Sequence, residues 1–219
     1  MARLRIVSKS GSVRVTAEPG AGVTASTGVV ITEADGTFLV NAGSKSLDVR
    51  CEPGTDVVVG TLSGSIRCHG TFGVVRAVTK SGKIEIDDAT SVDARTGSGS
   101  VEVIACTGEC RVVVTSGSIK IGRAGRASLA GVSGTVRVDD TDAADVKSVS
   151  GRITVGYAGT GRVAIRSVSG TVDVEVPPDR APATRLMSIS GRVRRDCPEG
   201  SDGEIDVKTV SGTIRVTCK

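Results

Sequence analysis

Aromatic residues are almost absent from this sequence. Its 219 residues include Phe38, Phe72, Tyr157 and no tryptophan. Proteins that bind sugars or single-stranded nucleic acid commonly use aromatic rings as stacking platforms, so the shortage removes the usual means of binding either ligand. It is also consistent with a narrow core of Val, Ile, Ala and Leu, in which aromatic rings have little room.

Long hydrophobic runs are missing as well. No apolar stretch approaches the roughly 20 residues that a membrane-spanning helix needs, and the N-terminal MARLRIVSKSGSVRV has no signal-peptide pattern. We therefore expect a cytoplasmic protein without membrane insertion, with the cell surface as the alternative location. The net charge of +4 is mild and indicates solubility more than an anionic partner.

Residues that could carry catalysis are scarce. His69 is the only histidine, so the serines of the repeated Ser-Gly pairs have no base to activate them as nucleophiles. Acidic residues gather at 87–88 and 139–145, too far apart to act together. Cys106-x3-Cys110 is half of a zinc pattern, and no second Cys/His pair follows it. We expect no enzyme activity, no small-molecule substrate, no cofactor and no metal.

The six cysteines are Cys51, Cys68, Cys106, Cys110, Cys197 and Cys218. Cys51 and Cys68 lie 17 residues apart at the same place in the repeat described next, so we expect them to stack in the core of adjacent turns. Buried thiols in a reducing compartment are the simplest interpretation. A disulfide between them is the alternative, which strand geometry disfavours.

A short repeat dominates the rest of the sequence. Nine units built around Ser-Gly recur at 17 to 21 residues from Ser63 onward, and an earlier unit stands at Ser10-Gly11. Two degenerate copies at Thr27-Gly28 and Ser46-Leu47 bring the number to twelve. A fixed short period is the signature of a repeat architecture. The clearest copies are VSGTVRV (132–138), VSGRITV (149–155), VSGTVDV (168–174) and VSGTIRV (210–216), with looser copies LSGSIRC (62–68) and ISGRVRR (189–195).

Within each unit, apolar residues recur with a period of two. Val136 and Val138 follow Ser133-Gly134, and Val163 and Ile165 precede Ser169-Gly170. A further apolar residue often stands directly before the serine of such a Ser-Gly corner. This alternation is typical of strands with one buried face, and the glycine permits a bend. Units this small must stack to bury a core. The sequence therefore predicts an all-β, right-handed parallel β-helix (β-solenoid) of about twelve turns, with 17–21 residues per turn.

We expect one domain over residues 1–219. Residues 1–61 form irregular turns, 62–176 form the regular body, and 177–219 form turns with longer loops. Proline-containing loops begin at Val176 and Cys197, at the same place in successive turns. Loops of this kind often form a binding face, although loops near the end of a solenoid can also be merely tolerated.

Stacking also predicts rows on the outer surface. The fourth residue after each corner serine forms a mostly basic row, interrupted by Glu85 and Glu102. Such a row could bind an anionic polymer, namely nucleic acid, a glycan or lipid headgroups, or it could simply be a solvated face. Its basic members are Arg14, Arg50, Arg67, Lys120, Arg137, Arg194 and Arg215.

The first and last units have no capping helix beside them. We therefore expect open layers of strand backbone at both ends, with Leu4, Ile6, Ile214 and Val216 as end-to-end contacts. Such ends predict a homo-oligomer or a protein partner, bound through the solenoid ends. Charged residues such as Arg3 and Arg5 would instead guard against that pairing.

The [VI]-S-G-x-[VI]-x-[VI] unit, clearest from Leu62 onward, resembles the bacterial "putative adhesin" domains. This β-solenoid family of unassigned function is related to autotransporter adhesin head-like domains. The resemblance implies a solenoid and offers no catalytic residues. We expect a non-enzymatic, adhesin-like scaffold or protein-interaction module that self-assembles end to end. The alternatives are a cell-envelope adhesin that binds an anionic glycan, and a nucleic-acid-associated or regulatory module that uses the basic row.

Overall fold

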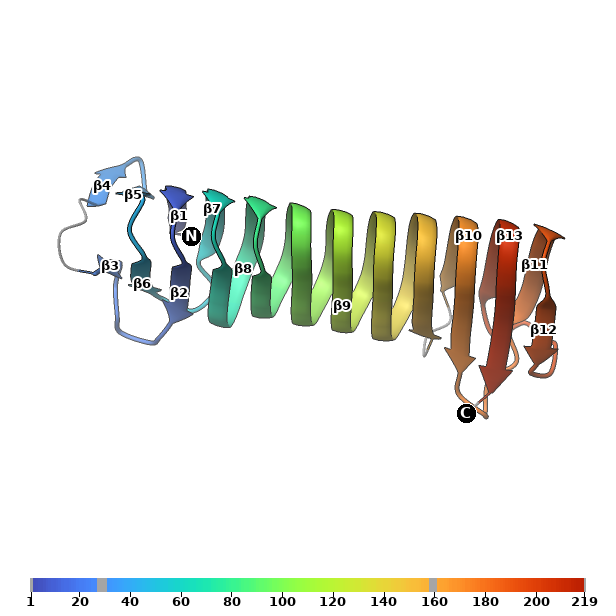
Figure 1. Ribbon diagram of the computed structural model, residues 1–219. Coiled ribbons are helices and arrows are strands. Elements are labelled where there is room, and N and C mark those ends of the chain that lie inside the picture. The colour runs from blue at the N-terminus through green and yellow to red at the C-terminus, as the bar shows by residue number, and fades with distance from the viewer. Residues whose placement is uncertain (1, 27–30, 158–160, 219) are drawn as a thin grey trace.

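The computed structural model describes residues 2–26, 31–157 and 161–218, and these residues contain β-strands and no helix, hence none that could span a membrane. The chain winds into a coil of stacked turns (Figure 1). The all-β, solenoid-like fold is confirmed, while its hand stays a prediction. The number of turns also stays a prediction, because the unit at Thr27-Gly28 lies outside the described residues. The strands are β1 (Arg3–Ser10), β2 (Val13–Ala17), β3 (Thr24–Ala25), β4 (Ile31–Ala34), β5 (Thr37–Gly43), β6 (Leu47–Cys51), β7 (Asp56–Ser63), β8 (Ile66–Ser81), β9 (Ile84–Tyr157), β10 (Arg162–Val176), β11 (Ala183–Ser190), β12 (Val193–Asp196) and β13 (Glu204–Cys218).

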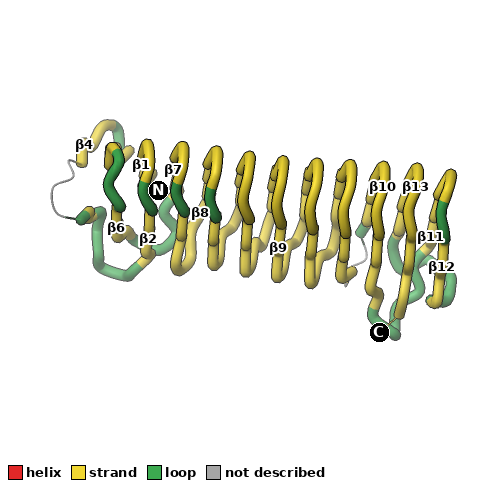
Figure 2. Tube along the Cα trace, viewed as in Figure 1, coloured by secondary structure: helices red, strands yellow, loops and turns green. Residues whose placement is uncertain are grey.

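Each regular turn has two strand segments that meet at a Ser-Gly corner, and β9 runs through several turns without a break (Figure 2). Val163 and Ile165 before a corner, and Val172 and Val174 after it, are fully buried, as the period of two predicts. We call the outward residues of the segment before the corner the first face, and those of the segment after it the second face. Each face is a parallel sheet in which equivalent residues of successive turns are in register, so that they form single-residue rows across the strands.

The corner glycines stack into a column that runs from Gly11 to Gly191. Gly134 has a φ of 133°, which side chains with a Cβ rarely adopt, and a Cβ on it would overlap the carbonyl oxygen of Gly117 in the turn below. A buried hydroxyl two residues before the serine supports the corner, as Ser167 Oγ does by donating to the Ser169 carbonyl at 3.2 Å. Glycine is therefore required at this corner by both backbone conformation and space.

At the N-terminal end, the order of the turns differs from the order of the sequence. β1 pairs in parallel with both β5 and β7, and β2 pairs with both β6 and β8. The unit formed by β1 and β2 therefore lies between β5 and β6 on one side and β7 and β8 on the other. The prediction that Leu4 and Ile6 form an end contact is wrong, because both are buried between two turns. The outer turn is covered in part by β4 and β3, which run antiparallel to β5 and β6.

The C-terminal end has the same kind of exchange. β13 pairs with β10 on one side and with β11 and β12 on the other. Ile214 and Val216 are therefore fully buried one layer inside the end, and their predicted end contact is also wrong. The longer loops after β10 and β12 give the chain enough length to skip a layer and return. The outermost described turn is formed by β11 and β12 (Figure 1).

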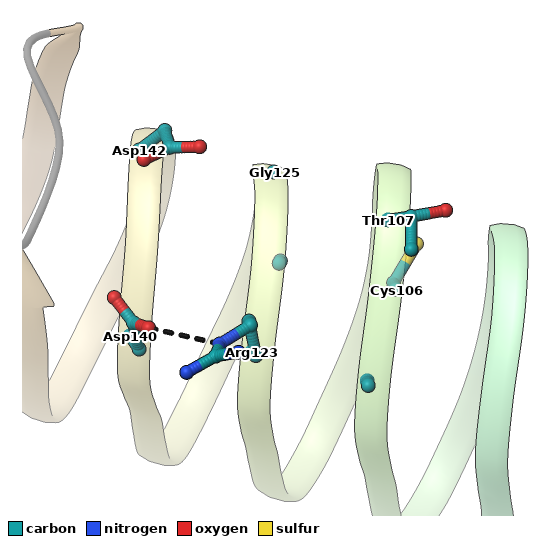
Figure 3. Close-up of a pocket in the computed structure, with 8 residues that line it drawn as sticks. Cys106, Thr107, Arg123, Gly125, Asp140 and Asp142 are labelled. Carbon is teal, nitrogen blue, oxygen red and sulfur yellow. Dashed lines mark hydrogen bonds and ion pairs between the residues drawn. The ribbon is translucent and has the colours of Figure 1, made fainter.

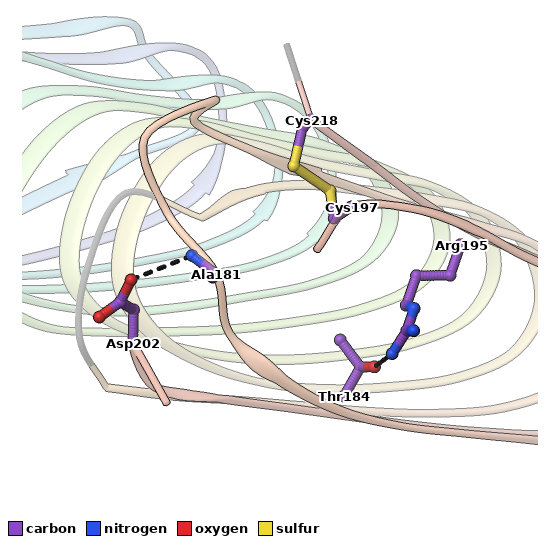
Figure 4. Close-up of a disulfide and its surroundings, with 6 residues drawn as sticks. All are labelled: Ala181, Thr184, Arg195, Cys197, Asp202 and Cys218. Carbon is purple, nitrogen blue, oxygen red and sulfur yellow. Dashed lines mark hydrogen bonds between the residues drawn. A yellow bond between two sulfur atoms is a disulfide. The ribbon is translucent and has the colours of Figure 1, made fainter. Parts of the chain in front are cut away.

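A disulfide holds this outer turn to the inserted one. Cys197 follows β12, Cys218 ends β13, and their Cα atoms are 5.3 Å apart (Figure 4). Both residues stand seven positions after a corner serine, a coincidence of register from which the pair could have been predicted. The predicted stacking of Cys51 on Cys68 is wrong, because β2 lies between β6 and β8. Both thiols are buried and free.

We predict that Gly134→Ala destabilises the protein by roughly 2–4 kcal/mol, because the new Cβ meets both an unfavourable φ and a backbone oxygen. The thermal midpoint should fall by about 5–15 °C. Gly60→Ala is the matched control, since Gly60 has open space around its Cα and no positive φ. Equal thermal midpoints for the two variants would contradict the role of the glycine column.

We also predict that Cys197→Ser loosens the outer turn selectively. A disulfide that closes a loop of this length contributes roughly 3 kcal/mol, and the loss should stay local because each turn contacts only its neighbours. Hydrogen exchange should accelerate in β11 and β12 and stay unchanged in β7 and β8. Dithiothreitol should reproduce the effect in the native chain and add nothing in the variant. Unchanged exchange in β11 and β12 would show that the disulfide does not hold the end.

Candidate interaction surfaces

The predicted basic row lies on the second face, where acidic neighbours neutralise much of it. Lys83 forms ion pairs with both Glu85 and Glu102, Arg67 contacts Glu85 at 2.5 Å, and Lys120 contacts Glu102 at 3.1 Å. Hydrogen bonds from Lys83 and Arg67 lower the pKa of Glu85, and those from Lys120 and Lys83 lower the pKa of Glu102. The same contacts raise the pKa of Lys83. This part of the row is a chain of alternating charges across neighbouring turns.

Other predicted members of the row are also paired. The distances from nitrogen to carboxylate oxygen are 3.5 Å for Arg14–Asp48, 2.6 Å for Arg137–Asp139 and 2.9 Å for Arg194–Asp196. On the second face as a whole, the described side chains include ten Lys or Arg and eight Asp or Glu. The face is therefore nearly neutral, and a strong polyanion site is not built into it.

Arg50 does not belong to the predicted row. It aligns with Thr16, whereas Asp48 aligns with Arg14, and Arg50 instead contacts Glu18 at 3.7 Å. The register was misjudged because Ser46 is not a corner residue, since Leu47 already pairs with Val13. The last predicted member, Arg215, lies with Arg152 and Asp173 in a shallow groove of about 690 Å³.

The first face is different, because most of the exposed apolar residues gather there. Of the thirteen large hydrophobic side chains that are exposed in the described residues, eleven lie on this face. Ile104 lies on the second face, and Val193 is an inward residue left open at the C-terminal end. The eleven are Val7, Leu39, Leu62, Val74, Val78, Val132, Val149, Val168, Met187, Ile189 and Val210.

Five of these residues form an unbroken ladder across consecutive turns. Val132, Val149, Val168 and Val210 are 47–49% exposed, and Ile189 in the outermost turn is 79% exposed. Each stands directly before a corner serine, and the serines that follow the last four pair from turn to turn. Each lies an odd number of residues from the inward residues of the segment before its corner, so the alternating pattern of the sequence could have placed these side chains on the outer surface. An apolar ladder of this length points to an interaction surface.

The first face also carries the excess positive charge. Lys147, Arg166 and Lys208 are in register on three adjacent turns beside the apolar ladder. Lys208 has a distant contact with Asp206 at 3.8 Å, and Lys147 and Arg166 have no ion pair with a described residue. On the face as a whole, thirteen described side chains are Lys or Arg and six are Asp or Glu. Stacked like charges repel, and an anionic partner would relieve that repulsion.

The narrow side of the coil between the two faces holds a depression of about 380 Å³. Arg123 and Asp140 form an ion pair of 3.0 Å across it, and Asp142 and Cys106 also line it (Figure 3). A hydrogen bond with the Cys110 thiol lowers the pKa of Cys106 to about 7, while the same bond raises the pKa of Cys110. Cys106 is only 1% exposed, so its thiol is nearly inaccessible to solvent although the residue borders the depression.

Two solved structures and one protein family are similar to this chain. The chain resembles a "putative adhesin" from Bacteroides fragilis (12% identity, 97% of this chain and 91% of that one, TM-score 0.45). It also resembles a "putative cell adhesion protein" from Clostridium sporogenes (9% identity, 100% and 92%, TM-score 0.28). None of the curated proteins is similar to it. The family described as Toastrack DUF4097 matches residues 1–217, and the chain belongs to this family.

Proposed function

We propose that the protein is a non-enzymatic, adhesin-like binding module that attaches through its first face to an anionic lipid surface. The observation that carries this proposal is the segregation of charge and apolar surface. Exposed Val, Leu and Ile side chains and excess Lys and Arg share one sheet face, while the opposite face is nearly neutral. A stack of strands some tens of ångströms long presents these groups in nearly straight rows, which suits a planar partner.

Both kinds of side chain contribute to such binding. Burial of a half-exposed valine in the interfacial region stabilises the bound state by about 1 kcal/mol. A lysine or arginine near an anionic bilayer contributes about 1 kcal/mol as well. Val149 and Val168 lie beside Lys147 and Arg166, so the two contributions act over the same patch.

The other anionic partners fit this face less well. A glycan or nucleic acid gains nothing from a ladder of Val and Ile. Phe72 and Tyr157, which would be the natural stacking platforms for bases, are instead buried in the core. The row first predicted to bind polyanions is paired with carboxylates.

The Cys197–Cys218 disulfide bears on the location of such a membrane surface. Disulfides form and persist in oxidising compartments, so this bond supports the cell surface over the cytoplasm. We therefore propose that the anionic lipids are met from outside the cell, with the four buried thiols protected from oxidation by the core.

We predict that the protein sediments with vesicles that contain phosphatidylglycerol and not with vesicles of pure phosphatidylcholine. Binding should weaken as sodium chloride rises from about 50 to 500 mM. The triple variant Val149→Ser, Val168→Ser, Val210→Ser should bind at least about tenfold more weakly, because it removes the apolar contribution. The variant Lys147→Gln, Arg166→Gln, Lys208→Gln should lose binding to a similar extent.

The matched control for charge is Arg14→Gln, Lys120→Gln, Arg137→Gln, which removes three cations from the second face. Its affinity for the vesicles should stay within about twofold of the native chain. Equal losses from the two faces would rule out the first face as the contact surface. Failure to bind either kind of vesicle, or tighter binding to an anionic glycan or to DNA, would overturn the choice of partner.

A further inference from the structure

We propose that copies of this chain stack head to tail, with β4 of one copy docking against β11 of the next. The two ends of the coil are different layers, each with one charged side chain at a position that is apolar in the turns beneath it. These charges have opposite sign. The inference concerns a second copy of the chain and does not depend on the lipid surface proposed above.

The C-terminal end presents an open strand edge. β11 has eight residues and pairs only with β13 among the described strands, so its outer edge offers unpaired backbone groups. Its inward residue Leu186 is only partly buried, and Val193 of β12 is 43% exposed. An edge of this length readily accepts another strand.

Arg195 of β12 is the charged residue of this end. It aligns with the fully buried Val216 of β13 and thus occupies an inward position. Its guanidinium crosses the open layer and donates a 3.0 Å hydrogen bond to Thr184 Oγ1 of β11 (Figure 4). It also forms an ion pair of 3.0 Å with Glu199. A guanidinium has five N–H donors, so Arg195 can donate hydrogen bonds to a second carboxylate.

Glu33 of β4 is the charged residue of the opposite end. β4 runs antiparallel to β5 and places Ile31 opposite Val40 and Glu33 opposite Phe38. Ile31 is partly buried against the core, whereas Glu33 is exposed. β3 and β4 contain no lysine or arginine. The outer edge of β4 is thus a short strand with an apolar residue and a carboxylate on its inward side.

Continuing the stack brings these residues together. Phe38 aligns with Leu4, six residues before Ser10, and Thr184 stands six residues before Ser190. Phe38 and Thr184 therefore belong to the same row, so a second copy placed on the same axis sets its Glu33 over Thr184. That is where the Arg195 guanidinium lies. The same placement sets Ile31 over Leu186, which covers the partly buried leucine.

The signs of the charges select the polarity of the contact. Two C-terminal ends would bring Arg195 against Arg195, and two N-terminal ends would bring Glu33 against Glu33. The head-to-tail contact instead sets Arg195 against Glu33, which have opposite charges. Because it joins two different surfaces around a common axis, it does not close on itself and gives an open filament. The filament would align the first faces of all copies along one side.

The test is light scattering after size exclusion, with negative-stain imaging, over a concentration series at low salt. The native chain should form rods whose length grows in multiples of one copy. Arg195→Glu and Glu33→Arg should each require at least about tenfold higher concentration to assemble, because each places like charges at the contact. An equimolar mixture of the two variants, and a chain carrying both substitutions, should each assemble as the native chain does.

Arg194→Gln is the matched control, because Arg194 lies on the same strand with its side chain outward and paired to Asp196. It should assemble normally, and circular dichroism should show that every variant is folded. Rods of one copy at all concentrations would overturn the proposal. Undiminished assembly of either single variant, or failure of the doubly substituted chain to assemble, would also overturn it. Vesicle binding is measured separately, so failure of the assembly proposal can be distinguished from failure of the lipid-binding proposal.

Discussion

The close stacking of the corner glycines is the constraint on which the rest of this structure depends. A side chain at Gly134 would collide with the backbone of the turn beneath it, so only a bare Cα lets successive turns approach at the spacing of hydrogen-bonded strands. That spacing brings equivalent residues into register over many turns. Once they are in register, any residue type favoured at one position of the repeat becomes a continuous row on the surface.

The two faces illustrate opposite consequences of such rows. On the second face, a row of one sign would repel itself, and acidic residues such as Glu85 and Glu102 alternate with the cations and relieve the repulsion. On the first face, the cations Lys147 and Arg166 stack without that relief, next to a ladder of valines. The first face therefore retains both unfavourable exposure and unbalanced charge, and contact with a partner would remove both. This contrast is why we assign the attachment role to the first face.

The ends pose the general problem of every solenoid, which is how to stop a stack of strands. Here each terminal unit is inserted one layer inside the end, so β1 and β13 are each held between two turns. The outer layers are then stabilised by other means. The N-terminal layer has the short antiparallel strands β3 and β4, and the C-terminal layer has the disulfide to β13. These different solutions leave Glu33 of β4 at one end and Arg195 of β12 at the other, and the proposed head-to-tail contact pairs these two residues.

In the regular units from Ser63 onward, the sequence by itself determined the strands, their inward residues and the corners. Period-two alternation, as at Val163 and Ile165, and the positive φ that favours glycine at the bend are local properties of the chain. Only the tertiary structure decided which turns are neighbours at the ends, because a loop of several residues can lead to the adjacent layer or past it. For that reason Leu4 and Ile214 were expected at the ends and are found inside them. The partners of the surface charges and the Cys197–Cys218 pair depend on the same neighbour relations, because a contact across turns exists only once the order of the turns is set.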